Sequence, residues 1–133
     1  MSSTFTIDRR SLGDAHVVAV HGELDVLTRD TFRACAAAAI RSSRAVVVDL
    51  SGTTLLDCAG LSALVAAQRE ARASGGELSV AGVHGLVRVL FDAFGMGCAL
   101  GGRDLDEELR RVRRRSRGTG SAPGCASLTA CAS

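Results

Sequence analysis

The stretch VVVDLSGTTLLDCAGL, residues 46–61, decides the fold of this chain. Its three consecutive valines predict a buried strand over residues 44–50, because β-branched side chains fit a pleated surface that is covered on both faces. Ser51-Gly52 is typical of a turn and predicts a loop after that strand. Asp57 then precedes a new apolar run, so the stretch predicts a strand, a loop and the start of a helix.

Asp57 has the properties of a helix N-cap. Its side chain can accept hydrogen bonds from the free N–H groups of Ala59 and Gly60. The residues that follow at helical spacing are Leu61, Leu64, Val65 and Gln68. Gly75-Gly76 predicts the end of this helix near Ser74, since glycine readily adopts the left-handed conformation of a helix C-terminus. Cys58 therefore lies in the first turn, at the positive end of the helix dipole.

The segment before this stretch predicts two strands and a helix. Alternating residues from Thr4 to Ile7 and the apolar run Ala15–His21 predict an antiparallel hairpin that turns at residues 11–14. Gly22-Glu23-Leu24-Asp25 is expected to form a loop with two carboxylates. Thr28 is expected to cap a helix whose apolar face contains Phe32, Cys35, Ala36, Ala39 and Ile40.

The segment after it predicts one more strand, two helices and a tail. Residues 77–81 are expected to form a strand, and residues 83–94 an amphipathic helix with its aromatic face inward that ends at Gly95 and Gly97. Residues 98–100 could add an edge strand. The last helix is marked by Leu105, Leu109 and Val112. Residues 116–133 contain almost nothing large to bury, so we expect a domain over 1–115 and a disordered tail over 116–133.

The expected element order is β-β-α-β-α-β-α-(β)-α. Strand-helix-strand repeats imply right-handed crossovers and parallel strands, whereas the first hairpin contributes an antiparallel pair. The sequence therefore predicts a single α/β domain, with a mixed four- to five-stranded sheet and about four helices.

Composition limits the possible functions. The chain has 133 residues, a hydrophobic content of 47% and a net charge of +2. No apolar run reaches the roughly 18 residues that span a bilayer and no signal peptide is evident, so we expect a cytoplasmic protein that is not bound to membrane. Five cysteines without close spacing indicate reduced thiols. Six of the 16 basic residues fall between Arg110 and Arg117, where a solvated helix end is favoured over a nucleic-acid contact because aromatic residues are missing.

With both loops placed, the chain resembles the bacterial anti-sigma-factor antagonists, which are stand-alone STAS domains. Two motifs carry the resemblance, VHGELD at residues 20–25 and LDCAGL at residues 56–61, each before a helix. The exit GGE at 75–77 and the helical segment VRVLFD at 87–92 add to it, and the similarity runs from about Phe5 to Val112. The resemblance implies a STAS-like fold.

The resemblance also implies a function. Such antagonists bind an anti-sigma factor that is a serine kinase of the histidine-kinase-like ATPase fold, and they thereby free a sigma factor for transcription, for example in stress responses. We therefore expect a non-enzymatic antagonist with no cofactor, no metal and no direct nucleic-acid partner. The implied partner-binding residues are Gly22, Glu23, Leu24, Asp25, Ser51, Asp57, Cys58, Ala59, Gly60 and Leu61.

One residue departs from the family pattern. In that family the serine directly after the loop aspartate is phosphorylated, and phosphorylation ends the interaction. Here this position is Cys58, and Ala59 also lacks a hydroxyl. A phosphoserine adds about −1.5 to −2 charges, which a thiol does not supply. We therefore expect binding without the usual phosphorylation switch at residue 58.

Two alternatives give Cys58 another role. Because a helix N-terminus favours the thiolate form, a redox-sensing partner-binding module is one alternative. A thiol-dependent enzyme is the other, and it would need His21 with Glu23 or Asp25 beside Cys58. His16 and His84 are expected to be surface or half-buried residues.

Overall fold

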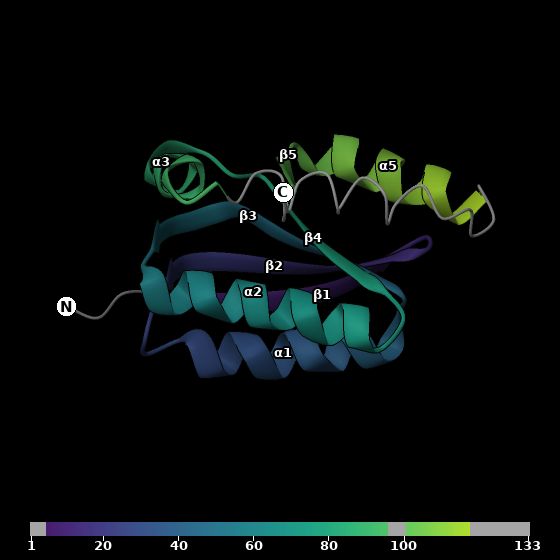
Figure 1. Ribbon diagram of the computed structural model, residues 1–133, viewed down its shortest axis with the longest axis horizontal. Coiled ribbons are helices and arrows are strands. Elements are labelled where there is room, and N and C mark those ends of the chain that lie inside the picture. The colour runs from purple at the N-terminus through teal and green to yellow at the C-terminus, as the bar shows by residue number, and fades with distance from the viewer. Residues whose placement is uncertain (1–4, 96–100, 118–133) are drawn as a thin grey trace.

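The computed structural model describes residues 5–95 and 101–117 (Figure 1). Its strands are β1 (Thr6–Leu12), β2 (Ala15–Leu24), β3 (Ala45–Leu56), β4 (Glu77–Ala81) and β5 (Gly101–Arg103). Its helices are α1 (Arg29–Ser42), α2 (Cys58–Ala73), α3 (Gly85–Ala93) and α5 (Leu105–Arg117). The expected order of elements is confirmed.

The strands form one mixed sheet with the order β1-β2-β3-β4-β5. The first two are antiparallel, and the neighbours from β2 onward are parallel. Gly13 and Asp14 make the tight turn between β1 and β2, and Gly13 has the positive φ of 64° that two-residue hairpin turns favour. The mixed α/β sheet therefore agrees with the prediction from sequence.

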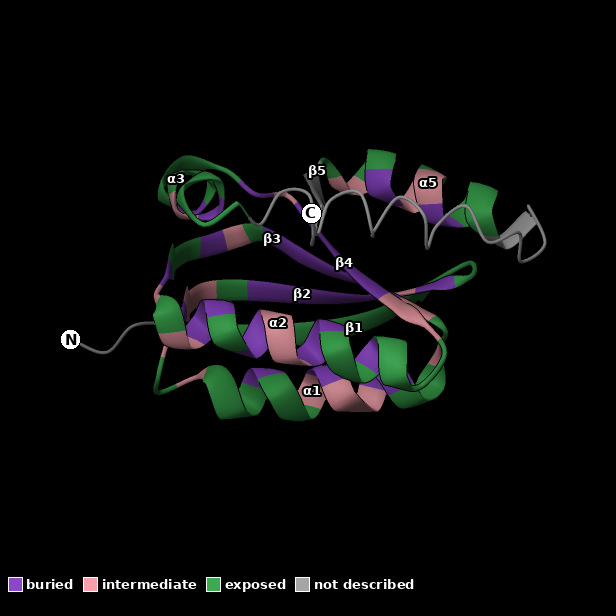
Figure 2. Ribbon diagram, in the orientation of Figure 1, coloured by how far each residue is buried: buried purple, intermediate pink, exposed green. Residues whose placement is uncertain are grey.

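Helices cover both faces of this sheet. Helices α1 and α2 lie side by side on one face, and α5 lies on the other side of the strands (Figure 1). Alternating residues of β3 explain the two layers, since Val46 and Val48 belong to the main core and Val47 to a smaller core under α5. Figure 2 shows buried segments alternating with more exposed ones along both α1 and α2.

Strands β2 and β3 are longer than the sequence indicated. Residues 51–56 continue β3, so the prediction of a loop after Leu50 was wrong, and Gly22 to Leu24 continue β2 in the same way. Pairing with β2 holds the extension of β3 in place, and His21 lies opposite Gly52. Thr53 is buried, and its hydroxyl donates a hydrogen bond to the Val20 carbonyl at 3.0 Å. A Cβ atom on Gly52 would lie 2.2 Å from Nδ1 of His21, so this glycine marks a close approach and not a turn.

Helix α3 lies beside the part of β3 that β4 leaves unpaired. The pairing with β4 ends at Asp49, and Nε2 of His84 lies 2.8 Å from the Ser51 carbonyl just beyond it. A carbonyl oxygen only accepts, so His84 donates this bond and replaces a strand partner at that point.

The predicted inward aromatic face of α3 is only partly correct. Val87 and Phe91 are buried, whereas Leu86, Val89 and Phe94 are exposed. The charged residues Arg88 and Asp92 share one side of the helix, and the apolar side is too broad to be covered fully by its packing against β3.

Helix α5 combines an apolar stripe with ion pairs. Val112 packs against the smaller core together with Leu105 and Leu109, as predicted. The fully buried Glu108 pairs with Arg111, which also lies 3.7 Å from Glu77 at the start of β4. The expected edge strand at 98–100 lies outside the described residues, and so does the expected tail except for the end of α5. Within the described ranges, no helix has the length and apolar character needed to cross a membrane.

Candidate functional site

The two sequence motifs meet at one edge of the sheet. Strands β2 and β3 are parallel, and Glu23 pairs with Leu55 and Leu24 with Leu56 at their carboxyl ends. The N–H of Asp57 then donates to the Leu24 carbonyl at 3.3 Å. This edge is where α/β sheets usually present ligands and partners, because the connections that follow the strands gather there.

Asp57 is the N-cap of α2, as predicted. Its Oδ1 accepts a hydrogen bond from the Gly60 N–H at 2.8 Å. Cys58, the first residue of the helix, is exposed. The site therefore presents a capped helix N-terminus with a solvent-accessible thiol in its first turn.

Gly60 permits the close packing of this helix against the end of β2. A Cβ atom at this position would lie 2.2 Å from the Leu24 carbonyl oxygen and 2.8 Å from Cδ1 of Leu56. Leu24, Gly60 and Leu61 are all buried. These three residues of the predicted partner-binding set thus expose little surface to solvent.

The segment after β2 is ordered by Asp25. Its Oδ1 accepts hydrogen bonds from the N–H groups of Leu27 at 3.0 Å and Thr28 at 3.2 Å. Thr28 is the N-cap residue of α1, but it makes no side-chain cap, which corrects the prediction. Its hydroxyl instead accepts from the Asp25 N–H and donates to the Glu23 carbonyl, so this oxygen is already committed to the turn.

Sequence reasoning missed the apolar surface around this turn. Leu27 is 85% exposed, Val26 55% and Leu55 40%. The available signal was the pair Val26-Leu27 between two turn-forming residues. Two large apolar side chains on a short tight connection have few neighbours to cover them, so they project into solvent.

Ser51 and His21 lie away from this edge. His21 pairs with Gly52, four residues before the end of β3, which is about 13 Å along a strand from Leu56. Its ring lies 3.7 Å from Asp8 on β1. Ser51 is bonded to the Asp49 side chain through its N–H and to His84 through its carbonyl. The register therefore separates His21 from Cys58 by more than the reach of a hydrogen bond.

Two side chains away from this edge, Cys35 and His16, have shifted pKa values. Burial raises the pKa of the half-buried Cys35 thiol, and nearby Asp8 adds to the effect against an opposing contribution from Arg9. Burial, with Arg9 contributing, lowers the pKa of His16. Both effects favour neutral side chains. Cys35 is thus expected to be a small packing residue of α1, as its sequence pattern indicated.

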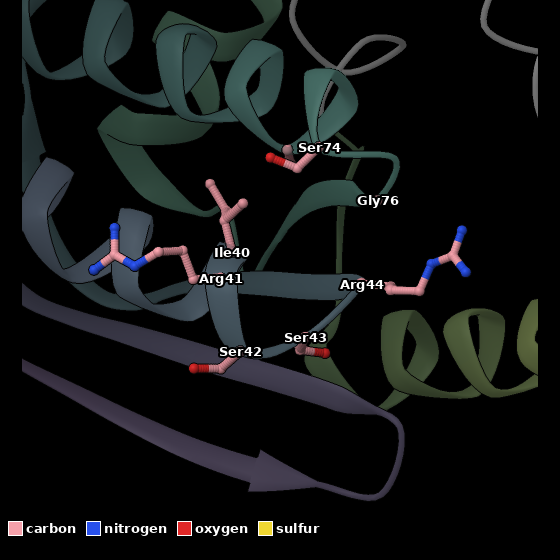
Figure 3. Close-up of a pocket in the computed structure, with 8 residues that line it drawn as sticks. Ile40, Arg41, Ser42, Ser43, Arg44, Ser74 and Gly76 are labelled. Atoms are coloured by element: carbon pink, nitrogen blue, oxygen red, sulfur yellow. The ribbon is translucent and has the colours of Figure 1, made fainter.

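A pocket of about 340 Å³ lies at the opposite end of the two sheet-covering helices. It is lined by Ile40, Arg41, Ser42, Ser43, Arg44, Ala71, Ser74 and Gly76. Figure 3 shows Arg41 and Arg44 extending to opposite sides, away from the pocket. The hydroxyls of Ser42, Ser43 and Ser74 donate to backbone carbonyls. None of the residues predicted for the functional site lines this pocket.

Comparisons with known proteins agree with this architecture. A family model described as "Mlab, STAS domain" matches residues 7–101. No curated protein matches the sequence. An anti-sigma factor antagonist from Mycobacterium paratuberculosis is 25% identical, with a TM-score of 0.75 and coverage of 83% of this chain and 95% of the other.

Two further solved structures are similar in fold. A putative anti-sigma factor antagonist from Thermotoga maritima is 17% identical, with a TM-score of 0.70 and coverage of 80% and 94%. The anti-sigma factor antagonist SpoIIAA in its unphosphorylated form is 22% identical, with a TM-score of 0.68 and coverage of 83% and 96%. At these identities the likeness concerns the fold.

Proposed function

Because this chain belongs to the STAS domain family, we propose that it is an anti-sigma-factor antagonist, which binds a kinase-type anti-sigma factor and so frees a sigma factor. The proposal is supported by the similarity to the antagonist from Mycobacterium paratuberculosis, which extends over 83% of this chain. Such a function would place the chain in the bacterial cytoplasm.

One hydrogen bond supports assigning the docking face to specific residues. The N–H of Asp57 donates to the Leu24 carbonyl, so the two sequence motifs lie next to each other. Asp25, Asp57, Cys58 and Ala59 are at least partly exposed there, together with Glu23. We infer that these residues form the docking face, and that Leu24, Gly60 and Leu61 hold it in shape.

Residue 58 gives the proposal its second part. The thiol of Cys58 is exposed at the N-terminus of α2, where a phosphoryl group would add about −1.5 to −2 charges to the docking face. Cysteine does not offer the hydroxyl that a serine kinase phosphorylates. We therefore infer that the antagonist is not released by phosphorylation at this position.

The role is one of binding and not of catalysis. A thiol enzyme would need a base beside Cys58, and His21 lies opposite Gly52 and next to Asp8.

Direct binding tests the proposal. The chain is immobilised, and purified kinase-type anti-sigma factors from the source bacterium are passed over it. We expect one of them to bind the wild-type chain, and Asp57→Ala and Asp25→Ala to weaken that binding by disordering the two connections. Arg10→Ala, on the exposed outer strand β1, serves as the control. Failure of every such factor to bind the wild-type chain would overturn the proposal.

A further inference from the structure

Three exposed apolar side chains lie on the segments that carry the proposed docking face. Val26 and Leu27 follow Asp25 in the connection after β2, and Leu55 on β3 pairs with Glu23 on β2. Single exposed apolar residues are ordinary in folded proteins, but a group of them indicates an interaction surface. Among the described residues, Leu27 is the most exposed large hydrophobic side chain, at 85%.

The backbone that carries Leu27 is held in place. The N–H of Leu27 donates to Oδ1 of Asp25, and the N–H groups of Thr28 and Arg29 both donate to the Asp25 carbonyl. The Thr28 hydroxyl closes the turn against Asp25 and Glu23. A side chain on such a fixed turn loses little backbone entropy on binding, which is a property of strong interface anchors.

Two of the three carboxylates on the proposed docking face, those of Asp25 and Asp57, are already engaged within the chain. Asp25 accepts from Leu27 and Thr28, and Asp57 accepts from Gly60. The carboxylates of Asp25 and Asp57 therefore have a structural role, whereas the side chain of Leu27 is mostly in solvent. Leu27 is thus the most exposed apolar group at this edge that a partner can bury.

We propose that Leu27 is the apolar anchor of the docking face, and that it inserts into a hydrophobic pocket on the anti-sigma factor. Asp25 then acts as a positioning residue, which fixes the turn and does not pair with a cation of the partner. This inference rests on the proposed function, because it names the chemistry by which the same partner is held. Under this proposal, the partner is recognised at this edge through the burial of apolar surface.

The test measures binding of the purified kinase-type anti-sigma factor to four forms of the chain. They are the wild type, Leu27→Ser, Asp25→Asn and Leu12→Ser. Leu12 is an exposed leucine at the far end of β1, beside the hairpin turn, and serves as the matched control. Urea unfolding of each form is measured to check that the fold is retained.

We expect Leu27→Ser to weaken binding about tenfold or more with an unchanged unfolding midpoint. Leu12→Ser should bind like the wild type. Asp25→Asn should also bind within about threefold of the wild type, because an amide oxygen can accept the same two N–H bonds without the charge. Raising the salt concentration should change the wild-type affinity little.

Two outcomes would overturn the inference and leave the proposed function intact. In the first, the wild-type chain binds the anti-sigma factor and the Leu27→Ser chain binds it equally tightly. The other is a loss in Asp25→Asn equal to that in Leu27→Ser, which would show that the charge is the contact. If the wild-type chain binds no kinase-type anti-sigma factor, the proposed function fails and this inference fails with it.

Discussion

Gly60 and Leu24 approach so closely that a Cβ atom on the glycine would stand 2.2 Å from the Leu24 carbonyl oxygen. This contact joins the first turn of α2 to the end of β2. It fixes the relative position of the two halves of the proposed docking face. The absence of a side chain at residue 60 is thus a requirement of the site and of the fold.

Substituting Gly60 tests that contact. In most helices Gly→Ala is stabilising by up to about 1 kcal/mol. Here Gly60→Ala should lower the free energy of unfolding by about 1 to 3 kcal/mol, because backbone cannot move aside without disturbing the sheet. Urea unfolding measures the change. Ser62→Ala, at an exposed position of the same helix, should stay within about 0.5 kcal/mol. A Gly60→Ala chain that is more stable than the wild type would contradict this geometry.

Cys58 can be tested with the kinase partner and ATP. We expect no phosphate on residue 58 of the wild-type chain, and phosphorylation of Cys58→Ser, since the substituted hydroxyl lies exposed at the helix N-terminus. The phosphate should weaken binding by adding charge to the face. Peptide mass spectrometry locates the phosphate, and Cys58→Ala controls for loss of the thiol. Phosphate at residue 58 of the wild-type chain would refute the proposed lack of a switch.

His16 should make stability depend on pH. Its pKa is lowered in the folded state from 6.5, mainly by burial and also by Arg9, so the unfolded chain binds the proton more readily. The contribution of neutral His16 to the free energy of unfolding is fully present above about pH 6.5, and it is lost as the pH falls through the folded-state pKa of His16. Unfolding midpoints should therefore fall less for His16→Gln than for the wild type between about pH 7 and pH 5. An imidazole NMR titration with a midpoint above 6.5 would contradict the sign.

The ion pair under α5 gives a prediction for stability. Glu108 is fully buried and accepts from Nε of Arg111 at 2.8 Å, so its removal leaves a largely buried guanidinium with less compensation. Glu108→Ala should lower the free energy of unfolding by roughly 3 kcal/mol. The neighbouring Glu107 is exposed, and Glu107→Ala should have an effect within about 0.5 kcal/mol in the same urea experiment. Equal effects of the two substitutions would show that the Glu108–Arg111 ion pair does not contribute to stability.

The fold was predictable from the sequence because its signals are local. The valine run, the Gly13-Asp14 turn and the Gly75-Gly76 helix end each act within a few residues. The N-cap of Asp57 is also local, since its side chain bonds to an N–H only three residues away. The order of these elements leaves few ways to build a sheet, and the mixed sheet follows from it.

The extent of the strands was not predictable in this way. Ser51-Gly52 has the composition of a turn, but its conformation is decided by β2, a strand about thirty residues earlier in the chain. Glycine fits a turn through its conformational freedom and fits a crowded strand through its lack of a side chain. Only the ring of His21 beside Gly52 distinguishes the two uses.

The sequence by itself determined the elements, their order and the two motifs that carry the family resemblance, because hydrogen bonds and side-chain periodicity of short range specify them. The tertiary structure alone decided which residues of those motifs are surface and which are support. It buried Leu24, Gly60 and Leu61, turned Asp25 inward to hold its own loop, and left Leu27 exposed. Burial and hydrogen-bond partners depend on segments far apart in the chain, and these come together only when the sheet forms.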